Sequence, residues 1–215
     1  MAKSDPADLS MMFFLHSAFR RDLDRLATAV EGLADGARQR GQELAERWDF
    51  VGEALHHHHT CEDEHLWPLA RRKAPESASV LDEMQAEHRT IDPLLARVGD
   101  GFRRLAAGDE SVRPALAADL RALHGTLSDH LAHEERDAVP LLARTLTEGE
   151  LQAFAHSQRK AMKLSQVTMF VPWVLEGLPD PDRRKVLSSF PPPLRMLARR
   201  RWVPRYEKAS AAIWA

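Results

Sequence analysis

Two stretches of this chain repeat the same spacing of histidine, glutamate and proline. Residues 58–71 and residues 130–143 both begin with the pattern His-x3-Glu-x5-Pro-Leu. On a helix, residues four apart lie on one face about one turn from each other, so each pair can direct an imidazole and a carboxylate at a common point. One such pair is weak support by itself, because the chain has 11 histidines and 32 acidic residues. Each stretch is therefore a candidate pair of metal ligands.

The sequence around the two repeats favours helix up to about residue 145. Ala, Leu, Arg and Glu dominate this part, and alternating runs of Val, Ile and Thr are absent. Glycine, proline and polar residues interrupt it at four places and predict helices at roughly 8–32, 38–67, 77–107 and 112–139. Because the connections are short, neighbouring helices must run antiparallel. This predicts an all-α, up-down-up-down four-helix bundle over residues 1–145, with a bend at Pro93 in its third helix.

The spacing of histidines along the chain places them at one level of this bundle. His58 follows His16 by 42 residues, and His130 follows His88 by the same 42. The midpoints of both intervals fall in predicted turns, and Pro75, midway between Glu62 and His88, falls in the remaining turn. Equal path lengths to a turn and back return the chain to the same height. We therefore expect one core layer that contains His16, His58, Glu62, His88, His130 and Glu134.

Six nitrogen and oxygen donors are a suitable set for two metal ions. The two glutamates can bridge the ions while the histidines bind them terminally. Imidazole and carboxylate without thiolate suit iron, manganese or zinc, whereas a structural zinc site would need four tetrahedral ligands, often cysteine. The competing interpretation is a bundle with ordinary surface histidines and helix-stabilising salt bridges, which predicts no bound metal.

The histidine run 56–59 leaves the register of the second helix open by one residue. Successive helical residues point in different directions, so we expect only one of the four to face the centre. We choose His58, because the Pro-Leu repeat aligns it with His130. The pairs His59/Asp63 and His133/Asp137 also have the four-residue spacing, and they keep a register shifted by one residue as an alternative.

The two His-x3-Glu motifs followed by proline, with single histidines on the first and third helices, resemble the hemerythrin-like HHE cation-binding family over about residues 10–145. The resemblance implies a non-haem centre of two oxo- or hydroxo-bridged iron ions, with manganese or zinc as substitutes, that meets O2, peroxide or NO. It assigns ligand roles to His16, His58, Glu62, His88, His130 and Glu134.

One departure from the family pattern bears on function. Oxygen-carrying hemerythrins have two histidines a turn apart on the third helix, whereas here Asp92 stands four residues after His88. We expect either a less saturated iron or Asp92 as a ligand, and both favour peroxide chemistry or redox turnover over reversible oxygen carriage. The resemblance implies a role in redox stress, so the predicted function is a scavenger, a catalase-like enzyme or a sensor. The alternative is an iron- or oxygen-sensing module that acts through a partner rather than by turnover.

Residues 146–215 differ in character and predict a mostly helical extension. Residues 183–208 contain nine Lys or Arg with Glu207 as the one acid. We expect the extension to pack on the bundle, on a second copy in a homodimer or on another protein partner through residues 147–215. The net charge of −2 gives no reason to expect nucleic acid. The sequence has no apolar run long enough to span a membrane, no signal-peptide pattern and a single cysteine, Cys61, which favours the cytoplasm.

Overall fold

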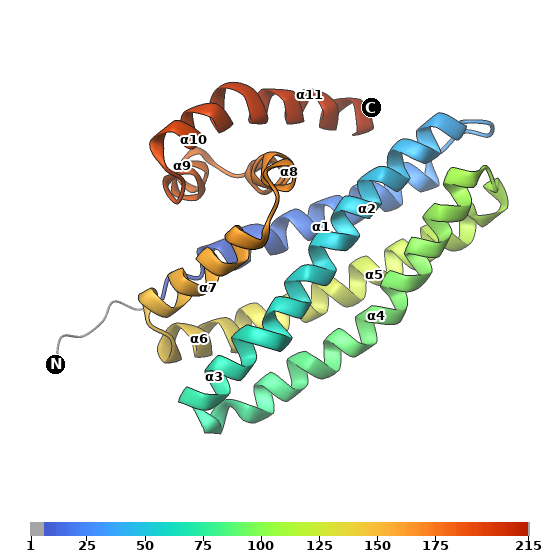
Figure 1. The fold of residues 1–215 in the computed structure, drawn as a ribbon. Helices are drawn as coiled ribbons and strands as arrows, with labels where there is room; N and C mark the ends of the chain where they lie inside the picture. The colour runs from blue at the N-terminus through green and yellow to red at the C-terminus, as the bar shows by residue number, and fades with distance from the viewer. Residues whose placement is uncertain (1–6, 215) are drawn as a thin grey trace.

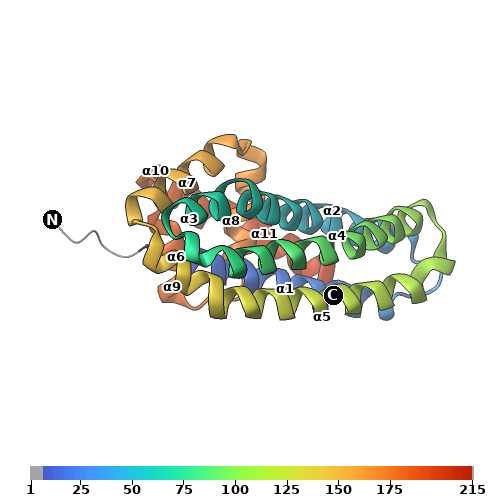
Figure 2. The same ribbon diagram turned by 90° about the horizontal axis from the view of Figure 1, so that it is seen from below.

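The computed structural model describes residues 7–214, apart from the side chains of residues 159–161, and the described part folds into helices and turns without strands (Figure 1). The first six residues, which are part of the N-terminal stretch on which the signal-peptide prediction rests, lie outside it. Four antiparallel rods form a bundle: α1 (Ser10–Glu31); α2 (Arg38–Cys61) continued by α3 (Trp67–Lys73); α4 (Ala78–Ala107); and α5 (Arg113–His133) continued by α6 (Val139–Thr145). Figures 1 and 2 show these rods lying side by side. The predicted all-α four-helix bundle is confirmed.

Each rod buries a stripe of apolar residues at helical spacing. In α4 the stripe begins Leu81, Met84, His88, Ile91, so the histidine occupies a core position between aliphatic neighbours. In α5, His130 likewise follows Leu123 and Leu127 on the buried face. Helix α1 packs against α2 and α5, and α4 packs against the same two helices from the opposite side of the bundle. The four apolar stripes therefore meet along one axis. The bundle core is thus interrupted by polar side chains at one level.

The second and fourth rods are longer than the sequence predicts, because neither ends at its proline. Each passes through a π-helical turn, Glu62–Leu66 and Glu134–Ala138, and then resumes as α-helix. The Trp67 N–H donates to the carbonyl of Glu62, five residues back, and Pro68 then lies in the first turn of α3. Proline has no N–H to donate and is tolerated in a first turn. The wider turn therefore carries the rod past a residue that would otherwise break it.

The extension contains α7 (Glu148–Ala161), α8 (Leu164–Leu175), α9 (Asp180–Ser188), α10 (Pro192–Leu197), a π-helical turn (Ala198–Trp202) and α11 (Val203–Trp214). The first part of the extension forms two helices, α7 and α8, because the chain turns at residues 162–163. In Figure 1, α8 and α11 lie over the side of the bundle formed by α1 and α2, and contacts of α8 with α1 and of α11 with α2 agree.

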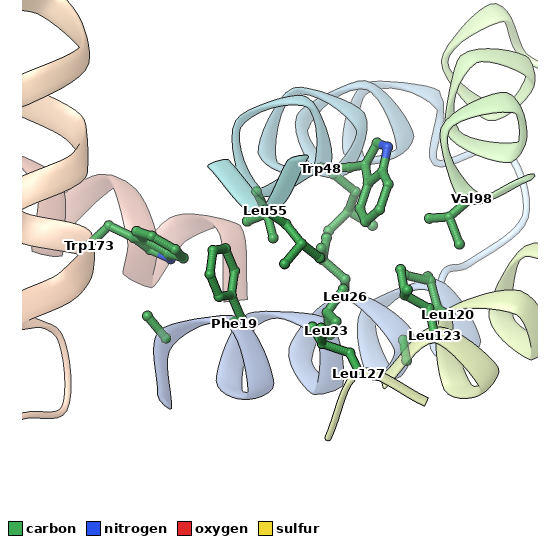
Figure 3. Packing of buried hydrophobic residues seen from close by; sticks show 14 of the residues in the cluster. Phe19, Leu23, Leu26, Trp48, Leu55, Val98, Leu120, Leu123, Leu127 and Trp173 are labelled. Carbon is green, nitrogen blue, oxygen red and sulfur yellow. The ribbon is translucent and has the colours of Figure 1, made fainter. Parts of the chain in front are cut away.

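The described residues form two separate apolar clusters. The larger joins the bundle to the extension, and Figure 3 shows Trp173 of α8 facing Phe19 of α1, with ring centroids 5.2 Å apart. The smaller contains Met12, Trp67, Met84 and Leu142 near the other end of the rods. Both Trp67 and Trp173 are fully buried. The described residues include no helix with the length and hydropathy needed to cross a membrane.

Candidate metal centre

The four rods bring together, between the two apolar clusters, all six side chains that the helix spacing places in one layer. His16 comes from α1 and His88 from α4, and the two π-helical rods supply the remaining four. A seventh donor, His59, lies with them. The seven residues are buried or nearly so: His16, His58, His59, Glu62, His88, His130 and Glu134.

The seven donors fall into two groups. His16, His58, Glu62 and Glu134 form one, and His59, His88 and His130 form the other. Within each group the ligand atoms lie within 4.8 Å of one another. In the second group, the Nε2 atoms of His88 and His130 are 3.2 Å apart, and the ring of His59 stacks on that of His88 with centroids 4.1 Å apart. Each group is compact enough to surround a single ion.

Glu62 connects the two groups. Its Oε1 lies 3.3 Å from Nε2 of His58, which belongs to the first group. Its Oε2 lies 3.5 Å from Nε2 of His88, which belongs to the second. Glu134 lies in the same layer, with Oε2 3.2 Å from Nε2 of His16. A carboxylate with one oxygen directed at each group is the arrangement that a bridging ligand requires.

Most of the inward-facing donor atoms make no hydrogen bond. Both oxygens of Glu62 and of Glu134, the Nε2 atoms of His16 and His58 and both ring nitrogens of His59 are buried without a hydrogen-bond partner. Leaving a buried polar group unsatisfied is unfavourable by about 1–3 kcal/mol, and such groups call for an explanation. Metal cations would satisfy these atoms together, so the donor set fits a metal centre.

The electrostatics of the layer keep two histidines ready to bind a cation. Burial, together with the charge of His16, lowers the pKa of His58 to about 3, and burial with the charge of His88 lowers the pKa of His59 well below its usual value. Both imidazoles are therefore neutral at pH 7, as ligation requires. Burial and the nearby Glu134 raise the pKa of Glu62. A bound cation would favour the ionised form of both glutamates.

Three of the histidines hydrogen bond to carboxylates on the side away from the layer. Nδ1 of His16 lies 2.9 Å from Glu135 Oε1, Nδ1 of His88 lies 3.0 Å from Asp63 Oδ1, and Nδ1 of His130 lies 2.7 Å from Glu87 Oε2. Their Nε2 atoms consequently point into the layer.

The sequence argument missed His59, because it allowed only one inward-facing residue in the run 56–59. A layer with two groups spans a wide arc, and residues about 100° apart on α2 reach different groups: His58 joins one and His59 the other. The four-residue spacing of His59 to Asp63 was the available signal. In α5 the layer receives only one histidine. His130 faces it, whereas His133 contacts Glu87 and Asp137 outside it.

Three other residues close to the donors in the sequence lie outside the layer. Asp92 is exposed and lines a surface hollow with His56, so the structure does not bring it together with the candidate ligands. His59 is the third histidine of the group that contains His88. His65 is exposed. Cys61 donates from Sγ to Oε1 of Gln158 at 3.0 Å, and burial raises the pKa of its thiol to about 11. This thiol is a buried structural group rather than a reactive one.

A four-helix bundle with a buried layer of five histidines and two glutamates defines a class of metal-cation-binding helical proteins. The chain belongs to the hemerythrin HHE cation-binding domain family, whose model matches residues 8–142.

Two curated relatives from Arabidopsis thaliana are similar over most of the chain. Zinc finger protein BRUTUS is 24% identical over 168 residues, which is 78% of this chain and 13% of that protein. Zinc finger protein BRUTUS-like At1g18910 is 22% identical over an alignment of 217 positions, 96% of this chain and 17% of that protein. The chain thus spans less than a fifth of the length of either relative. No solved structure matches it.

Proposed function

We propose that this protein holds two iron ions in the layer and binds or reacts with a small oxidant or diatomic ligand such as O2, peroxide or NO. The ligands are His16, His58, His59, Glu62, His88, His130 and Glu134. The observation that carries the proposal is the position of Glu62, whose two carboxylate oxygens are directed at histidines of different groups. A single-ion site would give no reason for a second group of three histidines. Iron in this setting supplies reversible one-electron chemistry and an open coordination position.

The two metal positions have unequal numbers of protein donors, which supports ligand binding at one of them. If both glutamates bridge, the position near His16 and His58 has two histidines and the other has three. The position with fewer histidines is the one left open for a small ligand. His58 is also the one donor of the seven that is not fully buried, with 9% of its side chain exposed. The ring of Phe19 lies 5.6 Å from that of His58 and limits access by water.

The first test is the metal content and optical spectrum of protein from iron-supplemented cells. We expect about two irons per chain and a near-ultraviolet band from an oxygen bridge, both diminished in His59→Ala and Glu134→Ala because each substitution removes a donor. His56→Ala is the matched control, since His56 belongs to the same histidine run but is exposed. A metal-free wild-type protein, or iron content unchanged by all three substitutions, contradicts the proposal. Peroxide consumption by the loaded protein then separates turnover from binding.

The connection between the extension and the donor layer through Phe19 favours a second candidate function, a metal sensor that acts through a partner. Phe19 contacts both the ligand His58 and Trp173 of α8, so metal occupancy and the packing of the extension share a side chain. Hydrogen exchange of residues 164–214 with and without iron tests this candidate. Exchange that slows on loading, without peroxide turnover, supports the sensor. Equal exchange in both states rejects it.

A further inference from the structure

Three carboxylates outside the layer each contact a histidine on the next rod, always in the same direction around the bundle. Asp63, from the rod of α2 and α3, contacts His88 on α4. Glu87 on α4 contacts His130 on α5. Glu135, from the rod of α5 and α6, contacts His16 on α1. Each of three rods thus supplies an acid to a histidine of the next rod, and every contact is made to Nδ1.

Two of these acids extend the sequence repeat by one residue. Asp63 directly follows Glu62, and Glu135 directly follows Glu134. Both acidic pairs lie at the beginning of a π-helical turn. Such a turn has more residues per revolution than an α-helix, so consecutive side chains diverge less in direction. The first acid of each pair can therefore face the layer while the second reaches the neighbouring rod's histidine.

Additional contacts hold these acids in place. Arg20 donates to Oε1 of Glu135 at 2.7 Å, and His133 Nδ1 lies 2.7 Å from the second oxygen of Glu87. Asp63 and Glu87 are each about one third exposed, and Glu135 is 22% exposed. By contrast, His59 has no hydrogen bond on either ring nitrogen. Each acid therefore hydrogen bonds to one particular histidine, and not every histidine of the layer has such a partner.

We propose that Asp63, Glu87 and Glu135 are positioning residues that hold His88, His130 and His16 in the metal-binding tautomer and lower the reduction potential of the centre. A carboxylate that accepts a hydrogen bond from Nδ1–H keeps the proton on Nδ1, leaves the Nε2 lone pair free and makes the imidazole a stronger metal ligand. Its negative charge also stabilises the more positive, oxidised metal. This inference rests on the proposed two-metal function and names how the same site is tuned.

The test replaces each acid by its amide: Asp63→Asn, Glu87→Gln and Glu135→Gln. We expect ferrous iron, measured by competition with a chelator, to bind about 10–100-fold more weakly to each variant. The midpoint potential of the iron form should rise in each, because a negative charge near the metals is lost. Glu64→Gln is the matched control: Glu64 adjoins Asp63 but is exposed. It should leave affinity within about twofold and the potential unchanged, since an exposed charge is screened by solvent.

A second readout does not depend on any variant folding. In the wild-type protein loaded with zinc as a diamagnetic probe, the Nδ1–H protons of His16, His88 and His130 should be visible by nitrogen-edited NMR and exchange slowly. Absence of these protons, or acid variants that match Glu64→Gln in affinity and potential, overturns the inference while leaving the two-metal function intact. A wild-type protein that binds no metal overturns the proposed function first, and the inference with it.

Discussion

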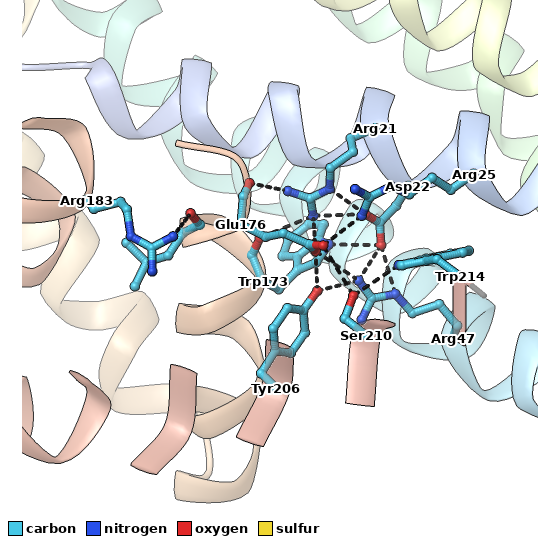
Figure 4. A network of polar contacts seen from close by, with 11 residues as sticks. Arg21, Asp22, Arg25, Arg47, Trp173, Glu176, Arg183, Tyr206, Ser210 and Trp214 are labelled. Atoms are coloured by element: carbon cyan, nitrogen blue, oxygen red, sulfur yellow. Dashed lines mark hydrogen bonds and ion pairs between the residues drawn. The ribbon is translucent and has the colours of Figure 1, made fainter. Parts of the chain in front are cut away.

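Asp22 of α1 is a fully buried carboxylate at the junction between bundle and extension (Figure 4). Arg47 Nε on α2 donates to its Oδ2 at 2.8 Å, and Arg21 Nε donates to its Oδ1 at the same distance. The indole Nε1 of Trp173 donates to Oδ2 at 3.2 Å. Arg47 is itself buried, at 3% exposure. The buried charge of Arg47 and the indole of a tryptophan from the extension therefore both depend on this one side chain.

Replacement of Asp22 by alanine should lower the free energy of unfolding by about 3–5 kcal/mol, because it leaves the charge of Arg47 buried and without its main partner. Urea unfolding at pH 7 measures the loss. Asp24→Ala is the control from the same helix. Asp24 pairs with Arg121 but is 57% exposed, and exposed pairs contribute about 1 kcal/mol or less. Equal losses in the two variants would show that the junction does not depend on the buried charge of Asp22.

At the scale of single residues, sequence spacing located six of the seven clustered donors, because rod length and turn position are local properties. It did not locate His59, whose role depends on the width of a layer built from four rods. It also missed Asp63, Glu87 and Glu135, because contact across rods depends on how each rod is rotated. The acidic pairs after each repeated histidine were visible in the sequence, but nothing there indicated that their members point in different directions.

The extension is anchored by α8 and by Glu176, the residue that follows it. Glu176 accepts hydrogen bonds from Arg25 on α1 and from Tyr206 and Ser210 on α11. One carboxylate thus joins the bundle to two helices of the extension. Burial raises the pKa of Glu176, but the hydrogen bonds from Arg25 and Tyr206 outweigh it, and the net pKa lies below the ordinary value of 4.5.

This shift predicts how stability depends on pH. A carboxyl group with a lowered folded-state pKa stabilises the fold above its unfolded pKa, and the contribution is lost as pH falls through the folded-state pKa. Glu176→Gln should therefore lower the free energy of unfolding at pH 7 by about 1–3 kcal/mol, the range for hydrogen bonds to a charged group. The difference from wild type should shrink as pH falls below about 4.5.

Urea unfolding of both proteins between pH 7 and pH 3 checks this expectation. Glu207→Gln is the control, because Glu207 pairs with Arg183 at 3.4 Å but is 53% exposed. Its effect should be small at every pH. A constant difference between Glu176→Gln and wild type across the range would mean that the ionised carboxylate is not the stabilising form.

At the scale of elements, the four rods were predicted well and their ends poorly. The prolines at 68 and 140 predicted helix ends, yet both rods continue through π-helical turns. The helix preferences of single residues are those of the regular α-helix. They do not anticipate that a rod can accommodate a proline by forming one wider, π-helical turn before it. The extension was predicted as helical, but its attachment to α1 and α2 depends on Trp173 and Glu176 meeting residues more than a hundred positions away.

For the molecule as a whole, the bundle has a polar layer between two apolar clusters. The larger cluster continues into the extension, so the layer of candidate metal ligands is enclosed at both ends by packed side chains. This arrangement explains why sequence reasoning succeeded with the fold: the apolar stripes are continuous apart from the donors themselves. Sequence reasoning could not indicate which face of the bundle the extension covers. The basic residues that mark the extension in the sequence lie largely on its exposed side.

The equal 42-residue paths from His16 to His58 and from His88 to His130 limit how a gene for this protein can change length. One residue inserted within a rod, between a donor and the turn, rotates that donor by about 100° and raises it by about 1.5 Å relative to its partners. The same insertion in a connection such as residues 32–37 only lengthens a loop, at little free-energy cost. Length variation among descendants of this sequence should therefore concentrate at the ends of the bundle, while the rods keep their residue counts.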